Sequence, residues 1–289
     1  MSGKLGLVVY GDAQASVIAD VLNALPAVTG RATVAYVDAG AVKRDAVPRC
    51  DILLEQTPGE PGTPDGTPAA ASVHVRFPEL KLGTLWPFNC VNPFNRPDPP
   101  GFPHGRFPHG DSFLLSCLAQ GVPRADALRL YAGPWNPSWP DLDALFTGET
   151  ERLTALDAQN DVPIGATILE QFRTRRLFLA PHSPSDVLLS QLITQLLARA
   201  FPGEPAIAQA DVPGVFSRLG SRDCFGGFAL PIHPGVARYA RLTWYDPNAR
   251  YTYFDREQLT ARTYYERFID DALANGAGAK ASPERTSIG

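Results

Sequence analysis

Short apolar runs separated by polar turns dominate the first third of the chain. Residues 5–10 form a continuous apolar run ending at Gly11, which is typical of a strand buried on both faces. Apolar residues then recur at helical spacing over 17–25 and stop at Pro26. Three further runs predict strands at residues 33–37, 51–55 and 73–77. This strand, loop, helix, strand order favours an α/β fold, with a parallel-sheet core covered by helices.

Helical patterns dominate the chain beyond Gly110. Asp111 can cap a helix over 113–120, and Pro123 suits the first turn of another that runs to Tyr131. Helical spacing returns over residues 149–159, 164–172, 187–201 and 256–273. A strand-like stretch at 177–180 leads through a tight loop into the third of these helices. The C-terminal half is therefore expected to be rich in helices.

Two proline-rich segments interrupt these patterns, and they hold 11 of the 28 prolines. Residues 57–72 are rich in proline, glycine and small polar residues, so we predict a mobile loop. Residues 87–109 carry aromatics among their prolines, and we expect part of this segment to lie against the core as a wall or lid over the site. We predict a single domain over 1–272 with these two insertions and a disordered tail at 273–289.

Composition and charge exclude several classes of protein. With 289 residues and 44% hydrophobic content, the chain can bury one large core. The net charge is -4 and no basic stripe is present, so we expect no nucleic-acid partner. No apolar run approaches the roughly 18 residues of a membrane span, and no signal peptide is recognisable, which predicts a cytoplasmic protein. Four scattered cysteines lack metal-ligand spacing, so we expect no metal: Cys50, Cys90, Cys117 and Cys224.

The strand prediction also locates a candidate site, because ligands of open parallel sheets lie outside the C-terminal strand ends. Two loops are expected there, at residues 11–14 and 181–186, and each leads into a helix N-terminus that favours an anion. They supply the candidate ligand-binding residues Gly11, Ala13, Gln14 and Ser183. A simple capping turn, with Asp12 or Ser16 accepting amide hydrogen bonds, would also explain the first loop.

Two histidines are candidate general bases. Carboxylates near His182, namely Asp186 and Asp12, could fix its tautomer and raise its basicity. His233 is followed by a proline and a short helix, and Arg238 on that helix is one of several arginines that could hold phosphates. A structural histidine in a tight loop is the alternative for both.

A series of short motifs resembles one known family. The opening VVYGDAQASVIADVL, FPEL at 77–80, the stretch 108–115, LFLAPHSPSDVLL at 177–189 and PIHPGVARYARLTWY occur in the order found in the WcbI-type capsular polysaccharide biosynthesis proteins. The resemblance covers most of the chain. It implies a bacterial enzyme of capsule or exopolysaccharide formation that uses acetyl-coenzyme A to O-acetylate a sugar.

The resemblance also implies site residues. It places His182, His233, Gln14 and Asp12 at the presumed acyl-transfer and coenzyme site. Ala13 stands where the family pattern has cysteine, and Asp12 where it has asparagine. If that cysteine is a nucleophile, alanine abolishes covalent catalysis. Three interpretations remain: direct attack by the acceptor hydroxyl, a changed or lost activity, or a deliberate replacement of the cysteine.

We therefore expect an acyl-coenzyme A-dependent O-acyltransferase, an acetyltransferase, acting on a sugar or polysaccharide-precursor hydroxyl. His182 would deprotonate the acceptor, Asp186 or Asp12 would orient it, and the backbone amides of residues 11–14 would hold an oxyanion or a phosphate. Coenzyme A or acetyl-coenzyme A would be the co-substrate and a saccharide the acceptor. The alternatives are an esterase-type hydrolase and a ligand-binding protein that lacks turnover because of Ala13.

Overall fold

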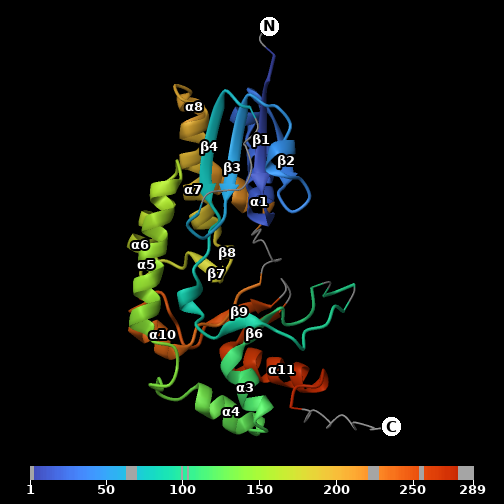
Figure 1. Ribbon diagram of the computed structural model, residues 1–289, viewed down its shortest axis with the longest axis vertical. Coiled ribbons are helices and arrows are strands. Elements are labelled where there is room, and N and C mark those ends of the chain that lie inside the picture. The colour runs from blue at the N-terminus through green and yellow to red at the C-terminus, as the bar shows by residue number, and fades with distance from the viewer. Residues whose placement is uncertain are drawn as a thin grey trace, which may run out of the picture.

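Four parallel strands form one sheet in the order β2-β1-β3-β4 (Figure 1). The computed structural model describes residues 3–62, 70–98, 100–102, 104–220, 228–253 and 257–278. The strands are β1 (Leu5–Gly11), β2 (Ala32–Asp38), β3 (Ile52–Thr57) and β4 (Val73–Pro78). The helices α1 (Ala13–Asn23) and α2 (Pro26–Thr29) connect β1 to β2. Because β1 lies between β2 and β3, the winding direction reverses there, which creates a topological switch point.

The two faces of this sheet are covered differently. Leu7, Val9 and Leu54 point into the large core beneath α1 and α7 (Asp186–Ala200). Val8 and Leu53 alternate with them and belong to a small cluster on the opposite face, which the β2–β3 connection covers with its short helix η1 (Arg44–Ala46). The predicted parallel sheet is confirmed, with helices on one face and a loop on the other.

The second half is rich in helices, as predicted. Asp111 caps α3, because its side chain accepts a hydrogen bond of 2.9 Å from the Leu114 amide. Asp141 caps α5, which therefore begins seven residues earlier than the apolar pattern suggests. The helices not yet given are α3 (Ser112–Ala119), α4 (Arg124–Tyr131), α5 (Leu142–Gln159), α6 (Ile164–Gln171), α8 (Pro205–Ala208), α9 (Val212–Leu219), α10 (Pro234–Tyr239), α11 (Ala261–Ala274) and η2 (Gly83–Leu85).

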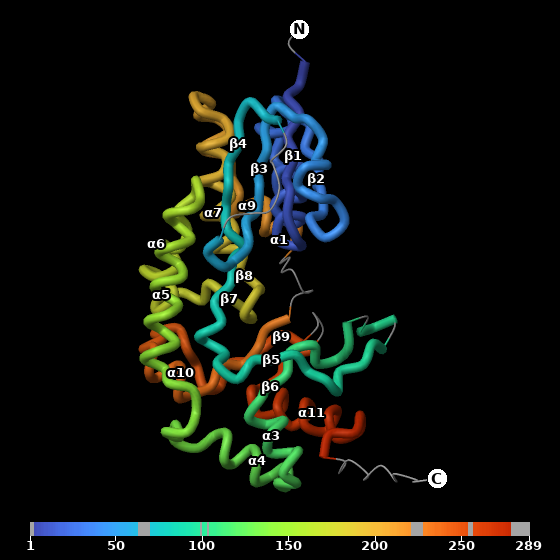
Figure 2. Tube along the Cα trace, viewed as in Figure 1, coloured from blue at the N-terminus to red at the C-terminus, as the bar shows by residue number. Residues whose placement is uncertain are grey.

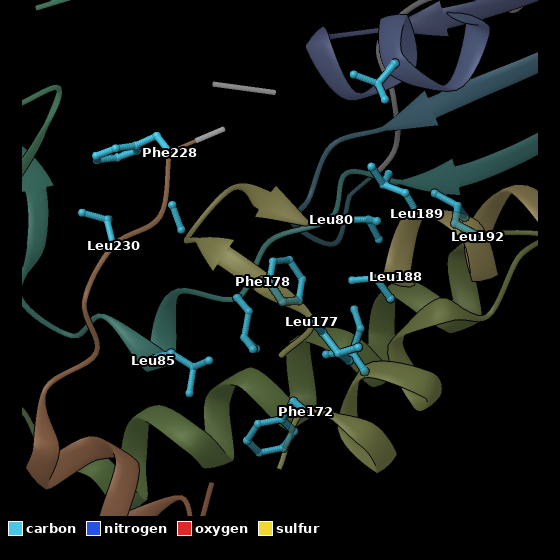
Figure 3. Close-up of a cluster of buried hydrophobic side chains, with 14 of the residues drawn as sticks. Leu80, Leu85, Phe172, Leu177, Phe178, Leu188, Leu189, Leu192, Phe228 and Leu230 are labelled. Carbon is cyan, nitrogen blue, oxygen red and sulfur yellow. The ribbon is translucent and has the colours of Figure 1, made fainter. Parts of the chain in front are cut away.

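The strand expected at 177–180 is not part of the parallel sheet. β7 (Phe178–Ala180) pairs antiparallel with β8 (Ser183–Pro184) in a tight hairpin. The Leu179 carbonyl accepts from the Leu230 amide at 2.8 Å, so this edge of β7 is paired by a segment outside the parallel sheet. Figure 3 shows Leu177 and Phe178 packed near Leu188 of α7, which ties the hairpin to the core.

The proline-rich segments are anchored at several points. β5 (Asn89–Val91) pairs antiparallel with β6 (His109–Asp111), and the buried Phe107 between them packs against Phe268 of α11. In the earlier segment, the Gly62 amide donates to Gln159 at 2.9 Å. β9 (Arg250–Tyr253) and β10 (Glu257–Thr260) precede α11, where helix was predicted from 256. Residues 63–69, Cys224 and the part of the predicted 273–289 tail from 279 onward lie outside the described residues, whereas residues 273 and 274 belong to α11.

The capping carboxyl of α3 makes stability depend on pH. Burial raises the pKa of Asp111 to about 7. The folded state then binds this proton more tightly than the unfolded state, so the group's contribution to stability declines as pH rises from about 4 to about 8. Asp111→Asn keeps a capping oxygen but cannot ionise. We expect it to remove this decline, at about 1.4 kcal/mol per pKa unit, in urea unfolding measured at several pH values.

The exposed cap Asp141 provides the matched control. Asp141→Asn should leave the pH dependence of the free energy of unfolding as in the parent protein. Equal pH dependence in the parent and in Asp111→Asn would contradict the prediction.

Candidate functional site

A cleft of about 600 Å³ opens at the C-terminal ends of the parallel strands. Gly11 and Asp12 line it after β1, Gln56 and Thr57 at the end of β3, and Glu79 after β4. The cleft therefore lies beside the β1/β3 switch point, where the sequence placed the first candidate loop. A side chain at Gly11 would collide with Gln56 and Ala15, so this turn requires glycine.

The N-terminus of α1 is held rigidly at the rim of this cleft. Asp12 accepts from the Gln14 amide at 2.8 Å, and its own amide donates to the Gln56 side-chain oxygen at 2.8 Å. Burial raises the pKa of the Asp12 carboxyl, the hydrogen bonds from Gln14 and Gln56 oppose that rise, and the charge of Glu79 adds to it. Within the described part of the chain the Ala13 amide makes no hydrogen bond, so it can donate to an anion.

Gln14 lies inside the protein, where its amide joins three segments. Its Nε2 donates to the Leu80 carbonyl at 2.8 Å and to the His182 carbonyl at 3.0 Å. Its Oε1 accepts from the Leu80 amide at 2.8 Å. The side chain is 3% exposed. Gln14 was expected to contact a coenzyme; in the structure it instead fixes α1, the chain after β4 and the β7–β8 hairpin together.

His182 occupies the turn of the β7–β8 hairpin and is paired with Glu79. Its Nδ1 lies 3.0 Å from Glu79 Oε1, and its side chain is 44% exposed. The hydrogen bond with His182 lowers the pKa of Glu79, so this carboxylate stays ionised and favours the tautomer with the proton on Nδ1. Nε2, which has no partner among the described residues, is then the basic nitrogen.

The orienting carboxylate is thus Glu79, whereas the sequence suggested Asp12 or Asp186. Asp12 serves as the cap of α1, and Asp186 is the first residue of α7, which Ser185 caps. Glu79 was missed although it follows a predicted strand within the FPEL motif. Strand-end position could have identified it, but the antiparallel hairpin that brings His182 to it has no sequence signal.

A second histidine, which was not among the predicted site residues, interacts electrostatically with His182. His109 in β6 has Nδ1 3.1 Å from the Asn89 side-chain oxygen, and its ring stacks on Phe228. Burial lowers the pKa of His109 to about 4, and the charge of His182 contributes.

Three other predicted residues lie apart from the cleft surface. Both ring nitrogens of the buried His233 are engaged, since Nε2 donates to the Tyr131 carbonyl at 2.6 Å and Nδ1 accepts from the Gly235 amide at 2.9 Å. His233 caps α10, and Figure 2 shows α10 near α5, away from the N-terminus of α1. Arg238 is an exposed residue of that helix, and Ser183 is fully buried in the hairpin.

The described part of the chain contains no group of three or more histidine, cysteine, aspartate or glutamate side chains that could hold a metal ion. None of its helices combines the length and the apolar character needed to cross a membrane.

Fold and site together define an α/β protein with a ligand cleft at a sheet switch point and a carboxylate-oriented histidine beside it. The family model described as polysaccharide biosynthesis enzyme WcbI matches residues 6–201, and the chain belongs to this family. A solved structure of WcbI, described as native protein without a disulfide bond between coenzyme A and a cysteine, is similar in fold. Its TM-score is 0.62 at 15% identity, covering 94% of this chain and 93% of that one. No curated protein matches the chain.

The internal role of Gln14 can be tested by unfolding experiments. Gln14→Ala leaves the amide and carbonyl of Leu80 and the carbonyl of His182 without their partner. We expect the free energy of unfolding to fall by about 3 kcal/mol, because buried polar groups lose their hydrogen bonds. The exposed Gln120, bonded only to Ser116, is the control, and Gln120→Ala should change stability by less than about 0.5 kcal/mol. Equal effects of the two substitutions would contradict this role.

Proposed function

We propose that the chain is an acyl-coenzyme A-dependent O-acyltransferase, with acetyl as the acyl group and a sugar or polysaccharide-precursor hydroxyl as the acceptor. The observation that carries this proposal is the His182–Glu79 pair beside the N-terminus of α1. Membership of the WcbI family supports a role in bacterial capsule or exopolysaccharide formation. The solved WcbI structure, whose description names coenzyme A, supports the choice of acyl donor, and we place the activity in the cytoplasm.

Each group of the site has a defined chemical task in this proposal. His182 Nε2 takes the proton of the acceptor hydroxyl as its oxygen attacks the thioester carbonyl. The ionised Glu79 stabilises the resulting imidazolium. The Ala13 amide and the N-terminal end of α1 stabilise the oxyanion. The carbon–sulfur bond then breaks, and His182 returns its proton to the departing thiolate, which leaves as coenzyme A.

This direct attack needs no protein nucleophile, so Ala13 is compatible with turnover. Asp12 contributes by capping α1 and thereby aiming its N-terminus. We give His233 a structural role, because its ring nitrogens are engaged. Ser183 and Arg238 are given no coenzyme contact in this proposal.

Hydrolysis is the second candidate function. The half-exposed ring of His182 admits water, which can replace the acceptor hydroxyl. Acetate release without any acceptor, detected by proton NMR, would favour a hydrolase.

Substitutions of His182 and Glu79 test the proposed role of His182 as the general base. We expect His182→Ala to lower kcat for acetyl transfer by about 10²–10⁴-fold, the usual contribution of a general base. Glu79→Gln should cost about tenfold, since the ring loses a charged partner. The rate is measured as free thiol released from acetyl-coenzyme A with a panel of methyl glycosides. His104→Ala, which alters an exposed histidine, is the control, and a parent-like rate in His182→Ala would contradict the assignment.

A cysteine introduced at position 13 tests the position of the coenzyme sulfur. A thiol at this helix N-terminus has a lowered pKa and attacks disulfides readily. We expect Ala13→Cys to form a mixed disulfide with coenzyme A disulfide, seen as a mass increase that dithiothreitol reverses. Asn23→Cys at the other end of α1 should react at least about tenfold more slowly. Equal rates would show that the coenzyme sulfur is not bound near residue 13.

A further inference from the structure

The cleft extends from the sheet edge onto the loop-covered face, where its charge is unbalanced. The described residues that line it include four carboxylates and two cations. The carboxylates are Asp12, Asp45, Glu55 and Glu79, and the cations are Lys43 and Arg44. The distribution of these charges determines which ligands can enter.

Arg44 is already neutralised within the protein. Its guanidinium forms an ion pair with Glu55, including a hydrogen bond of 2.9 Å from Nη2 to Oε2. Glu55 is 1% exposed, and its Oε2 also lies 2.6 Å from His74 Nε2. A phosphate would have to break this buried pair to bind Arg44, which leaves Glu55 without its strongest partner. Among the described residues that line the cleft, Lys43 is then the remaining cation for a ligand, opposed by Asp12 and Asp45.

The pKa values of Tyr10 and Asp12 reflect a negative electrostatic potential around the cleft. Burial raises the pKa of the Tyr10 hydroxyl, the charges of Glu55, Asp38 and Asp45 add to this effect, and Arg44 opposes it. The charge of Glu79 likewise raises the pKa of the Asp12 carboxyl. An additional anion in this space would meet the same repulsion, at an energy that falls with ionic strength.

We propose that this cleft is the acceptor subsite and that it selects a neutral or positively charged sugar over a uronate or a phosphorylated sugar. This inference rests on the proposed function, since it takes Glu79 and His182 as the reaction centre. Carboxylate oxygens accept hydrogen bonds from sugar hydroxyls, and an ammonium group pairs with them directly. The volume of about 600 Å³ is that of a small-molecule site. The same repulsion disfavours the phosphates of coenzyme A in this cleft.

Ligands that share a ring and differ in charge provide the test. Binding to the full chain is measured by saturation-transfer NMR with methyl glucoside, glucosamine, glucuronate and glucose 1-phosphate, with and without coenzyme A. We expect glucosamine and methyl glucoside to bind about tenfold more tightly than the two anions at low salt, and the difference to shrink in high salt. Equal binding of the anions, or no binding of any sugar, would overturn the proposal.

A charge reversal at Asp45 tests whether the cleft causes the preference for neutral or positively charged sugars. Asp45 is exposed and, among the described residues, forms no ion pair, so Asp45→Lys changes the field without removing a structural contact. We expect it to tighten glucuronate binding several-fold and to weaken glucosamine binding. Glu170→Lys makes the same charge change on the exposed side of α6 and is the control. Identical behaviour of the two variants would contradict the cleft as the source of selection.

Failure of the acyltransferase proposal and failure of the acceptor subsite give different results. Charge-selective sugar binding without thiol release from acetyl-coenzyme A would reject acyl transfer and retain the subsite. Thiol release with no preference among the four sugars would reject the subsite and retain acyl transfer.

Discussion

The buried amide of Gln14 is the interaction on which the site depends. It bonds to the chain after β4 and to the His182 carbonyl, so three segments far apart in sequence meet at one side chain. Because both ends of an amide must be satisfied in a dry interior, moving any of these segments away would leave buried polar groups unpaired. The separation of His182 from Glu79 follows from this arrangement. The buried Gln14 side chain therefore helps to fix the geometry of the site above it.

The sheet and most helices could be predicted from the sequence because local patterns specify them. The apolar run ending at Gly11 is buried on both faces, and the cap at Asp111 starts α3 where capping chemistry requires. The turn that follows β1 lies at the sheet edge named by the strand-end rule, where Gly11 and Asp12 line the cleft. These are features in which neighbouring residues carry enough information by themselves.

The prediction failed where contacts between distant segments decide the outcome. The stretch before His182 has the composition of a parallel strand, yet it pairs with the next residues and with Leu230. His233 has the sequence context of a site histidine, and only its burial against the Tyr131 carbonyl reveals a cap. Glu79 has no distinguishing composition, and its importance arises from a partner 103 positions away. Nothing in the local sequence encodes such pairings.

Glu79 also connects His182 to the rim of the cleft. One of its oxygens faces His182, and the other accepts a hydrogen bond of 3.2 Å from the Gly59 amide, at the start of the β3–β4 connection. The neighbouring Pro58 lines the cleft. A molecule that displaces this rim alters the hydrogen bonding of the carboxylate that orients the imidazole. In the proposed mechanism, binding at the rim and proton transfer at the hairpin therefore share one carboxylate, so the energetics of occupancy and proton transfer are linked.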